Sequence, residues 1–184
     1  MVSLVDLWLP ILIAAVIVHI ASAFMHMALP FWHTADYGKT GNDGPFVEAM
    51  RSLRSGLYMI PAMPPSKPTE EQMAEWSKGP SAIMYLRNPA SFSFPRTLGL
   101  HFLQCLVSAI LVAYIAGQTL APGTEYMRVM QIAGATGTIF WSFGSNISDA
   151  IWYGKPWRSA IKYAIDGLIY GLLMGGVFGW LWPE

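Results

Sequence analysis

The sequence predicts an all-α membrane protein: four transmembrane helices in an up-down bundle, with one long cytoplasmic connection that contains short amphipathic helices. Composition is the first reason. Hydrophobic residues make up 54% of the 184 residues and charged residues only 12%, about half the share typical of a soluble domain. The mean hydropathy is +0.40. The second reason is that four apolar stretches are each long enough to cross a hydrocarbon core, which takes about 20 helical residues.

The predicted spans cover about residues 7–29, 97–120, 126–149 and 157–182. Links rich in Pro and Gly follow the second and third spans, and such short links make neighbouring helices antiparallel. Four antiparallel spans place both termini on one side of the membrane. The whole chain, residues 1–184, is therefore expected to form a single transmembrane domain.

The long connection, residues 33–96, is expected to contain two short amphipathic helices. Asn42 or Asp43 is a candidate cap for a helix that begins at Pro45, and Thr69 is a candidate cap for the acidic segment that follows it. The connection is predicted to be a linker or an ordered cap over the bundle, not a second domain.

The distribution of charge predicts the orientation. Lys and Arg balance Asp and Glu at 11 each, so the chain lacks the basic face that a nucleic-acid partner requires. Of the basic residues, ten fall in the long connection or around the link before the last span, and Arg128 alone falls on the other side. The positive-inside rule then predicts that these ten residues lie in the cytoplasm and that both termini lie outside it.

Glycines recur every fourth residue along the last span, so they share one helix face and form a glycine zipper for close helix packing. They are Gly167, Gly171, Gly175 and Gly179. Their partner is either the third span, at Ala133 and Gly137, or a helix of another membrane protein.

Polar and ionisable residues lie within or next to the predicted spans, where such groups are rare and usually functional. They include His19, His26, His33, His101, Asp149, Lys162 and Asp166. In the first of three interpretations, they hydrogen-bond each other: Lys162 pairs with Asp166 four residues on, and Arg158 with Asp149.

The second interpretation is a metal or haem centre. His26 and His101 come from different helices and are candidate axial ligands of a haem, or ligands of a transition metal together with His33 or Asp149. In the third interpretation, Asp166, His19 and His26 line a path for protons or a small solute.

The segments HMALPFWHTADYGK, SDAIWYGKPW and FGWLWP, with the span pattern, resemble a family of small bacterial four-helix inner-membrane proteins. That resemblance brings no established activity. Because no nucleophile, phosphate-loop or metalloprotease motif is present, no catalytic residue is assigned. The leading hypothesis is a non-catalytic accessory or structural subunit that contacts lipid and the helices of other membrane proteins. The alternatives are a haem- or metal-binding redox protein and a small transporter or proton-conducting protein.

Overall fold

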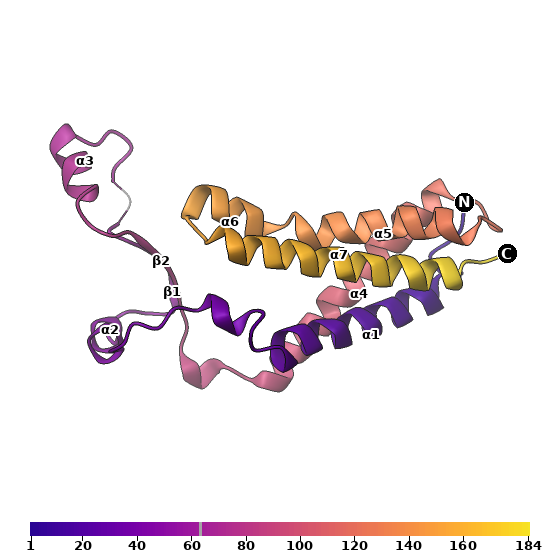
Figure 1. Cartoon of the computed structure of the whole chain (residues 1–184), viewed down its shortest axis with the longest axis horizontal. Coiled ribbons are helices and arrows are strands. Elements are labelled where there is room, and N and C mark those ends of the chain that lie inside the picture. The colour runs from indigo at the N-terminus through magenta and orange to yellow at the C-terminus, as the bar shows by residue number, and fades with distance from the viewer. Residues whose placement is uncertain (63) are drawn as a thin grey trace. The chain divides into compact units, whose positions relative to one another are not determined.

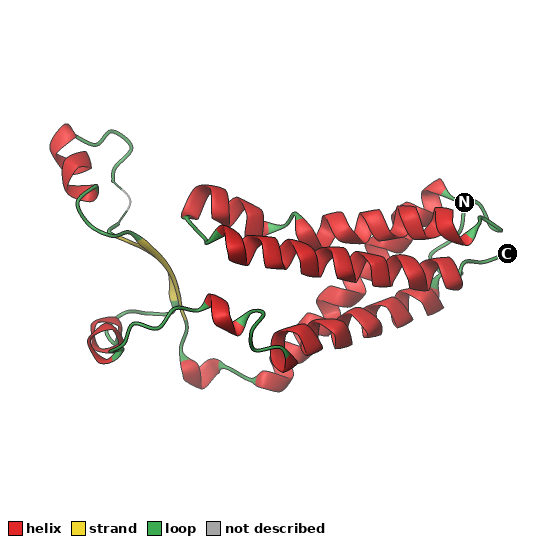
Figure 2. Ribbon diagram, viewed as in Figure 1, coloured by secondary structure: helices red, strands yellow, loops and turns green. Residues whose placement is uncertain are grey.

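The computed structural model describes residues 1–62 and 64–184, and 64% of the chain is helical (Figures 1 and 2). Contacts divide the chain into two compact units. One contains Met1–Gly38 and Phe94–Glu184, and the other contains Lys39–Ser93. The prediction of a helical membrane protein is confirmed at this level, since the described residues include three helices long and apolar enough to cross a membrane.

These three helices belong to the first unit and follow the predicted apolar stretches. The first, Trp8–Ala28, consists of α1 (Trp8–Ala23) and a π-helical turn (Phe24–Ala28). The others are α4 (Phe94–Thr119) and α7 (Trp157–Trp180). After the π-helical turn, Pro30 cannot continue a helix, and the chain makes a single 3₁₀ turn at Thr34–Asp36.

The third predicted span is divided. Instead of one helix over residues 126–149, the structure has α5 (Tyr126–Ser142, 17 residues) and α6 (Ser145–Tyr153). The break lies at Gly144, whose backbone is extended (φ −67°, ψ −152°). Among residues other than proline, glycine has the lowest helix propensity, so a helix ends readily there.

The glycines of α7 face α5 of the same chain. A Cβ added to Gly171 would lie 2.6 Å from the carbonyl oxygen of Gly134, and one added to Gly175 would lie 2.6 Å from that of Met130. Gly167 and Gly179 likewise face the two ends of α5. Two helix backbones approach this closely only where side chains are absent, so the stripe sets the α5–α7 packing.

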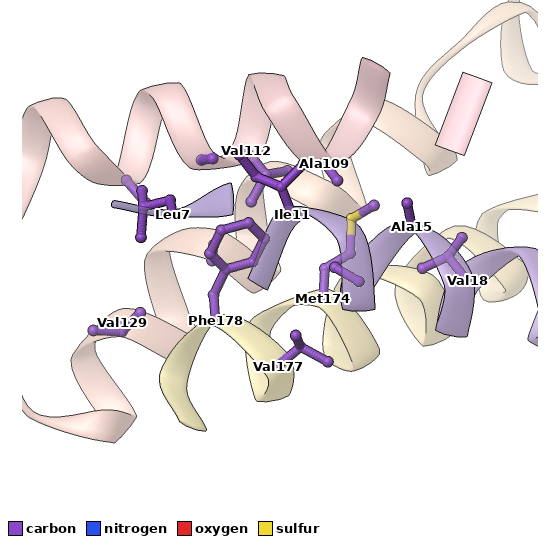
Figure 3. Close-up of a cluster of buried hydrophobic side chains, with 14 of the residues drawn as sticks. Leu7, Ile11, Ala15, Val18, Ala109, Val112, Val129, Met174, Val177 and Phe178 are labelled. Atoms are coloured by element: carbon purple, nitrogen blue, oxygen red, sulfur yellow. The ribbon is translucent and has the colours of Figure 1, made fainter. Parts of the chain in front are cut away.

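A hydrophobic core joins these helices (Figure 3). Met174 and Phe178 of α7 are fully buried and point toward α1 and α4, where they meet Ile11 and Val112. Beyond this core, toward the end of α1, the buried residues become polar.

Both termini lie beside the link between α4 and α5 (Figure 1). The Val2 amide donates to the Gly117 carbonyl (2.9 Å), and the Gly123 amide donates to the Pro183 carbonyl (2.8 Å). The indole N–H of Trp182 donates to the Ala121 carbonyl at 2.9 Å. These bonds hold the two ends of the chain at one end of the helices.

The second unit contains α2 (Gly44–Met50), α3 (Glu70–Trp76), a 3₁₀ turn (Pro89–Ser91) and a two-stranded antiparallel sheet. The predicted Thr69 cap is confirmed, because its hydroxyl accepts from the Gln72 amide while the Gln72 side chain accepts from the Thr69 amide. Helix α2 starts one residue before Pro45, with Asp43 at the N-cap position but without a side-chain cap bond. The sheet was not expected from the sequence. Its strands are β1 (Gly56–Ile60) and β2 (Ala82–Leu86).

Candidate functional site

The buried polar residues of the first unit join the loop after α1 to α7. Asp166, only 1% exposed, accepts two hydrogen bonds from this loop: one from the indole N–H of Trp32 (2.7 Å), and one along a 2.6 Å contact with Nε2 of His33. His33 is itself 5% exposed. The loop is therefore fixed to the middle of α7 by a buried carboxylate.

Lys162 lies one helical turn before Asp166 and contacts the same loop. Its ammonium group donates to Asp36 (2.5 Å) and to the backbone carbonyl of Trp32. The expected Lys162–Asp166 pair is thus replaced by contacts with the loop, because the four-residue spacing presents both side chains to it. Neither Asp149 nor Arg158 takes part in any of the described ion pairs.

Asp36 lies outside the membrane-spanning segments and is nearly buried. Burial alone would raise the pKa of its carboxyl group, but the hydrogen bond and positive charge of Lys162 outweigh that effect and lower the pKa. Its second oxygen, Oδ2, lies 3.9 Å from Nδ1 of His33. Both atoms are buried and have no hydrogen-bond partner among the described residues.

His26 stacks on His33, with ring centroids 4.2 Å apart and ring planes 15° from parallel. Nδ1 of His26 is 3.0 Å from the Ser22 carbonyl, which can only accept, so this nitrogen carries the proton and Nε2 has the free lone pair. His26, His33 and Asp166 each offer one metal-donor atom, and these three atoms lie within 4.8 Å of one another.

A second donor set lies about two turns before His26, at His19 of α1. Nδ1 of His19 is 2.9 Å from Nδ1 of His101, so one of the two nitrogens carries the shared proton. Cys105 Sγ is 3.9 Å from the same His101 nitrogen, and the Ser22 hydroxyl is 3.3 Å from the other. His19, His101 and Cys105 also offer three donor atoms within 4.8 Å of one another.

A cavity of about 480 Å³ adjoins both donor sets. Its lining includes His26 and Asp166 from the first set and His101 from the second. A smaller cavity of about 180 Å³ is lined by His33 and Asp36, and Tyr163 lines both cavities. The first donor set therefore lies between two cavities.

The structure does not bring together the residues that the sequence suggested as ligands of one centre. His26 and His101 share the large cavity but belong to different donor sets. Asp149 lies in α6 and belongs to neither. Trp32 and Asp36 were missed, although they flank His33 in the sequence at one and three residues' distance.

Comparison with known proteins adds no assignment, because no family model, curated protein or solved structure matches the chain. The resemblance to small four-helix inner-membrane proteins therefore stays a prediction. Function must be inferred from the geometry of the site itself.

Proposed function

We propose that the protein is an integral membrane protein that binds a divalent transition-metal ion through His26, His33 and Asp166. The observation that carries this proposal is the convergence of their three donor atoms within 4.8 Å. Two imidazoles and one carboxylate form a ligand set suited to Zn²⁺ or Fe²⁺.

The surrounding contacts support a cation at this position. Lys162 neutralises Asp36, which leaves the negative charge of Asp166 without a fixed counter-charge. Metal-ligating groups are commonly oriented by hydrogen bonds on their far side. The Ser22 carbonyl does this for His26, and the Trp32 indole does it for Asp166.

Metal binding requires two rearrangements. Imidazole nitrogens bind a metal in the plane of the ring, so His33 must rotate out of its stack on His26 before both rings can face one ion. The facing atoms of His33 and Asp166 are 2.6 Å apart, whereas two ligands of a tetrahedral Zn²⁺ ion are separated by about 3.3 Å. An ion would therefore replace the proton between them and move them apart by less than about 1 Å. His33 lies on a loop, which makes this displacement easier than one between two packed helices.

The proposed membrane arrangement has four crossings, with α5 as the third. Its 17 residues span about 26 Å, close to the thickness of a hydrocarbon core. Both termini lie beside the α4–α5 link, so α5 must lead the chain away from that end before α7 returns it. Four crossings and the asymmetry of Lys and Arg support the proposal that both termini lie outside the cytoplasm. The bacterial inner membrane is proposed from the resemblance alone.

The accessory-subunit role and the transporter role stay predictions. The feature that suggested docking to another protein was the glycine stripe of α7, and those glycines face α5 within the same chain. The metal site is preferred because it rests on a specific arrangement of side chains.

Metal analysis tests the proposal. Purified protein in mild detergent is stripped with a chelator, loaded with Zn²⁺, dialysed and assayed for bound metal. We expect a single Zn²⁺ per chain, lost in His26→Phe and Asp166→Asn. His19→Phe, in the second donor set, is the matched control and retains the ion. Trp32→Phe removes only the hydrogen bond to Asp166 and weakens binding about 10- to 100-fold.

Absence of stoichiometric metal in the loaded wild-type protein would refute the proposal, as would equal binding by the His26→Phe and His19→Phe variants. The absorption spectrum separates the haem alternative. If the wild-type protein shows a Soret band and both His26→Phe and His101→Phe lose it, the bound group is a haem in the large cavity and not a metal ion.

A further inference from the structure

The cavity of about 480 Å³ is much larger than a metal ion needs. Side chains from all four long helices of the first unit line it, including Ser22, His101, Trp141 and Tyr170. Its volume falls within the range of small-molecule binding sites. Of the donor set of His26, His33 and Asp166, only His26 and Asp166 line the cavity, so most of the space has no assigned role.

Two hydrogen-bond donors in its lining have no acceptor. The indole nitrogen of Trp141 and the hydroxyl of Tyr170 are buried, and neither has a hydrogen-bond partner within the described chain. Tyr170 is 3% exposed, and its hydroxyl lies near Ser22 without forming a hydrogen bond of standard geometry. The two rings meet edge to face with centroids 5.4 Å apart. Unpaired buried donors are rare. Both donor atoms lie behind the cavity surface, so a ligand that carries acceptors reaches them when the two rings turn toward the cavity.

The depth of these donors restricts the kind of ligand. Tyr170 is 13 residues from Trp157 and 10 from Trp180, the two ends of α7. At 1.5 Å per residue, it lies about 15–20 Å from either end of the helix. The ester carbonyls of a phospholipid stay at the membrane interface and do not reach this depth. A molecule that dissolves in the membrane interior reaches this depth, although the cavity also extends to Thr97 and Gly144 near the helix ends.

The side of the cavity that faces away from the core offers a route for such a molecule. Met27 is 62% exposed and Phe140 is 38% exposed, and both line the cavity. In the proposed arrangement these residues face lipid. The aromatic rings of Phe140, Trp141, Tyr163 and Tyr170 provide walls that suit a flat ring.

We propose that this cavity binds a membrane quinone. After small rotations of the Trp141 and Tyr170 side chains, the carbonyl oxygens of the quinone ring accept hydrogen bonds from Trp141 Nε1 and the Tyr170 hydroxyl. The ring packs against the aromatic walls, and the isoprenoid tail leaves into lipid between Met27 and Phe140. This inference does not depend on metal binding, because neither Trp141 nor Tyr170 belongs to the donor set.

The test uses the full chain in lipid nanodiscs, with decylubiquinone as the probe and the thermal unfolding midpoint as the readout. We expect decylubiquinone to raise the midpoint in a saturable manner. Trp141→Phe and Tyr170→Phe keep a ring but lose the donor, and each weakens binding about tenfold. Trp180→Phe, at an exposed position outside the cavity lining, is the matched control and binds as the wild type does.

Three results would overturn the proposal: no response of the wild-type protein to decylubiquinone, equal responses in the wild type and the Trp141→Phe/Tyr170→Phe double variant, or an equal response to decylbenzene, which has the ring and tail but no carbonyl groups. If the double variant does not fold, Ala23→Phe replaces it, since this substitution fills the cavity and keeps both donors. Saturable binding to Ala23→Phe would then contradict the proposal. Chelator-treated protein is expected to bind decylubiquinone unchanged, so failure of the metal site leaves this result intact.

Discussion

Lys162 and Asp166 are buried charged residues of α7, and each depends on partners that replace water. Lys162 is 7% exposed and Asp166 is 1% exposed. Isolated charges at such positions are very unfavourable, whereas paired and hydrogen-bonded charges are tolerated. The loop after α1 supplies these partners. The charges of α7 therefore determine where that loop is held.

Substitution of Lys162 by Met is expected to destabilise the protein strongly. It leaves the Asp36 carboxylate and the Trp32 carbonyl without their donor while preserving the length of the side chain. Loss of one partner of a buried ion pair lowers the free energy of unfolding by about 3–5 kcal/mol. SDS-induced unfolding from mild detergent measures this change.

The double variant Lys162→Met/Asp36→Asn is the control for the ion pair. With both charges removed, no isolated buried charge remains, so the double variant is expected to lose less stability than the two single variants together. Strictly additive losses would show that the Lys162–Asp36 contact contributes nothing as a pair.

At the level of elements, the packing of α5 against α7 depends on individual glycines, and two glycines five residues apart in α7 should differ sharply in their tolerance of a methyl group. A methyl group on Gly171 would clash with the Gly134 carbonyl, a backbone atom that cannot move away alone. One on Gly176 would meet only the Tyr126 hydroxyl, at an ordinary 3.7 Å.

Gly171→Ala is therefore expected to lower the free energy of unfolding by about 1–3 kcal/mol through overpacking. Gly176→Ala is the matched control, and its effect should lie between none and a gain of about 1 kcal/mol, because Ala favours a helix over Gly. The same SDS titration compares them. Equal stability of the two variants would contradict the close α5–α7 packing.

Elements determined by local sequence could be predicted, and those determined by distant contacts could not. Long apolar runs marked α1, α4 and α7, and Thr69 followed by Gln72 marked the cap of α3. The strands β1 and β2 are five residues each and pair across a long intervening segment, so neither shows a pattern by itself. The break at Gly144 was hidden because the apolar run continues up to Phe143.

The same distinction applies to the candidate site. Its residue types were visible in the sequence because ionisable groups stand out in apolar helices. Their pairing was not, since helical spacing favoured Lys162 with Asp166, whereas the folded loop brings Asp36 and His33 to them. His26 and His101 were candidate ligands of one centre in one of three interpretations, whereas in the structure His26 stacks on His33 and His101 contacts His19.

On the scale of the whole molecule, the number of crossings determines which segments share a side of the membrane. With four crossings, residues 3 and 184 share one side, and residues 67 and 152 share the other. If α5 does not cross, residue 152 moves to the side of residue 3, and residue 184 moves to the opposite side. A single set of labelling sites therefore distinguishes the two topologies.

Single cysteines at these positions, introduced into a Cys105→Ala background, test the topology in intact bacterial cells. All four positions are exposed. A membrane-impermeant maleimide is expected to label Ser3→Cys and Glu184→Cys directly, and Lys67→Cys and Trp152→Cys only after the inner membrane is permeabilised. Direct labelling of Trp152→Cys with protection of Glu184→Cys would show that α5 does not cross. The reverse of the expected pattern at all four sites would retain four crossings but contradict the orientation inferred from the Lys and Arg distribution.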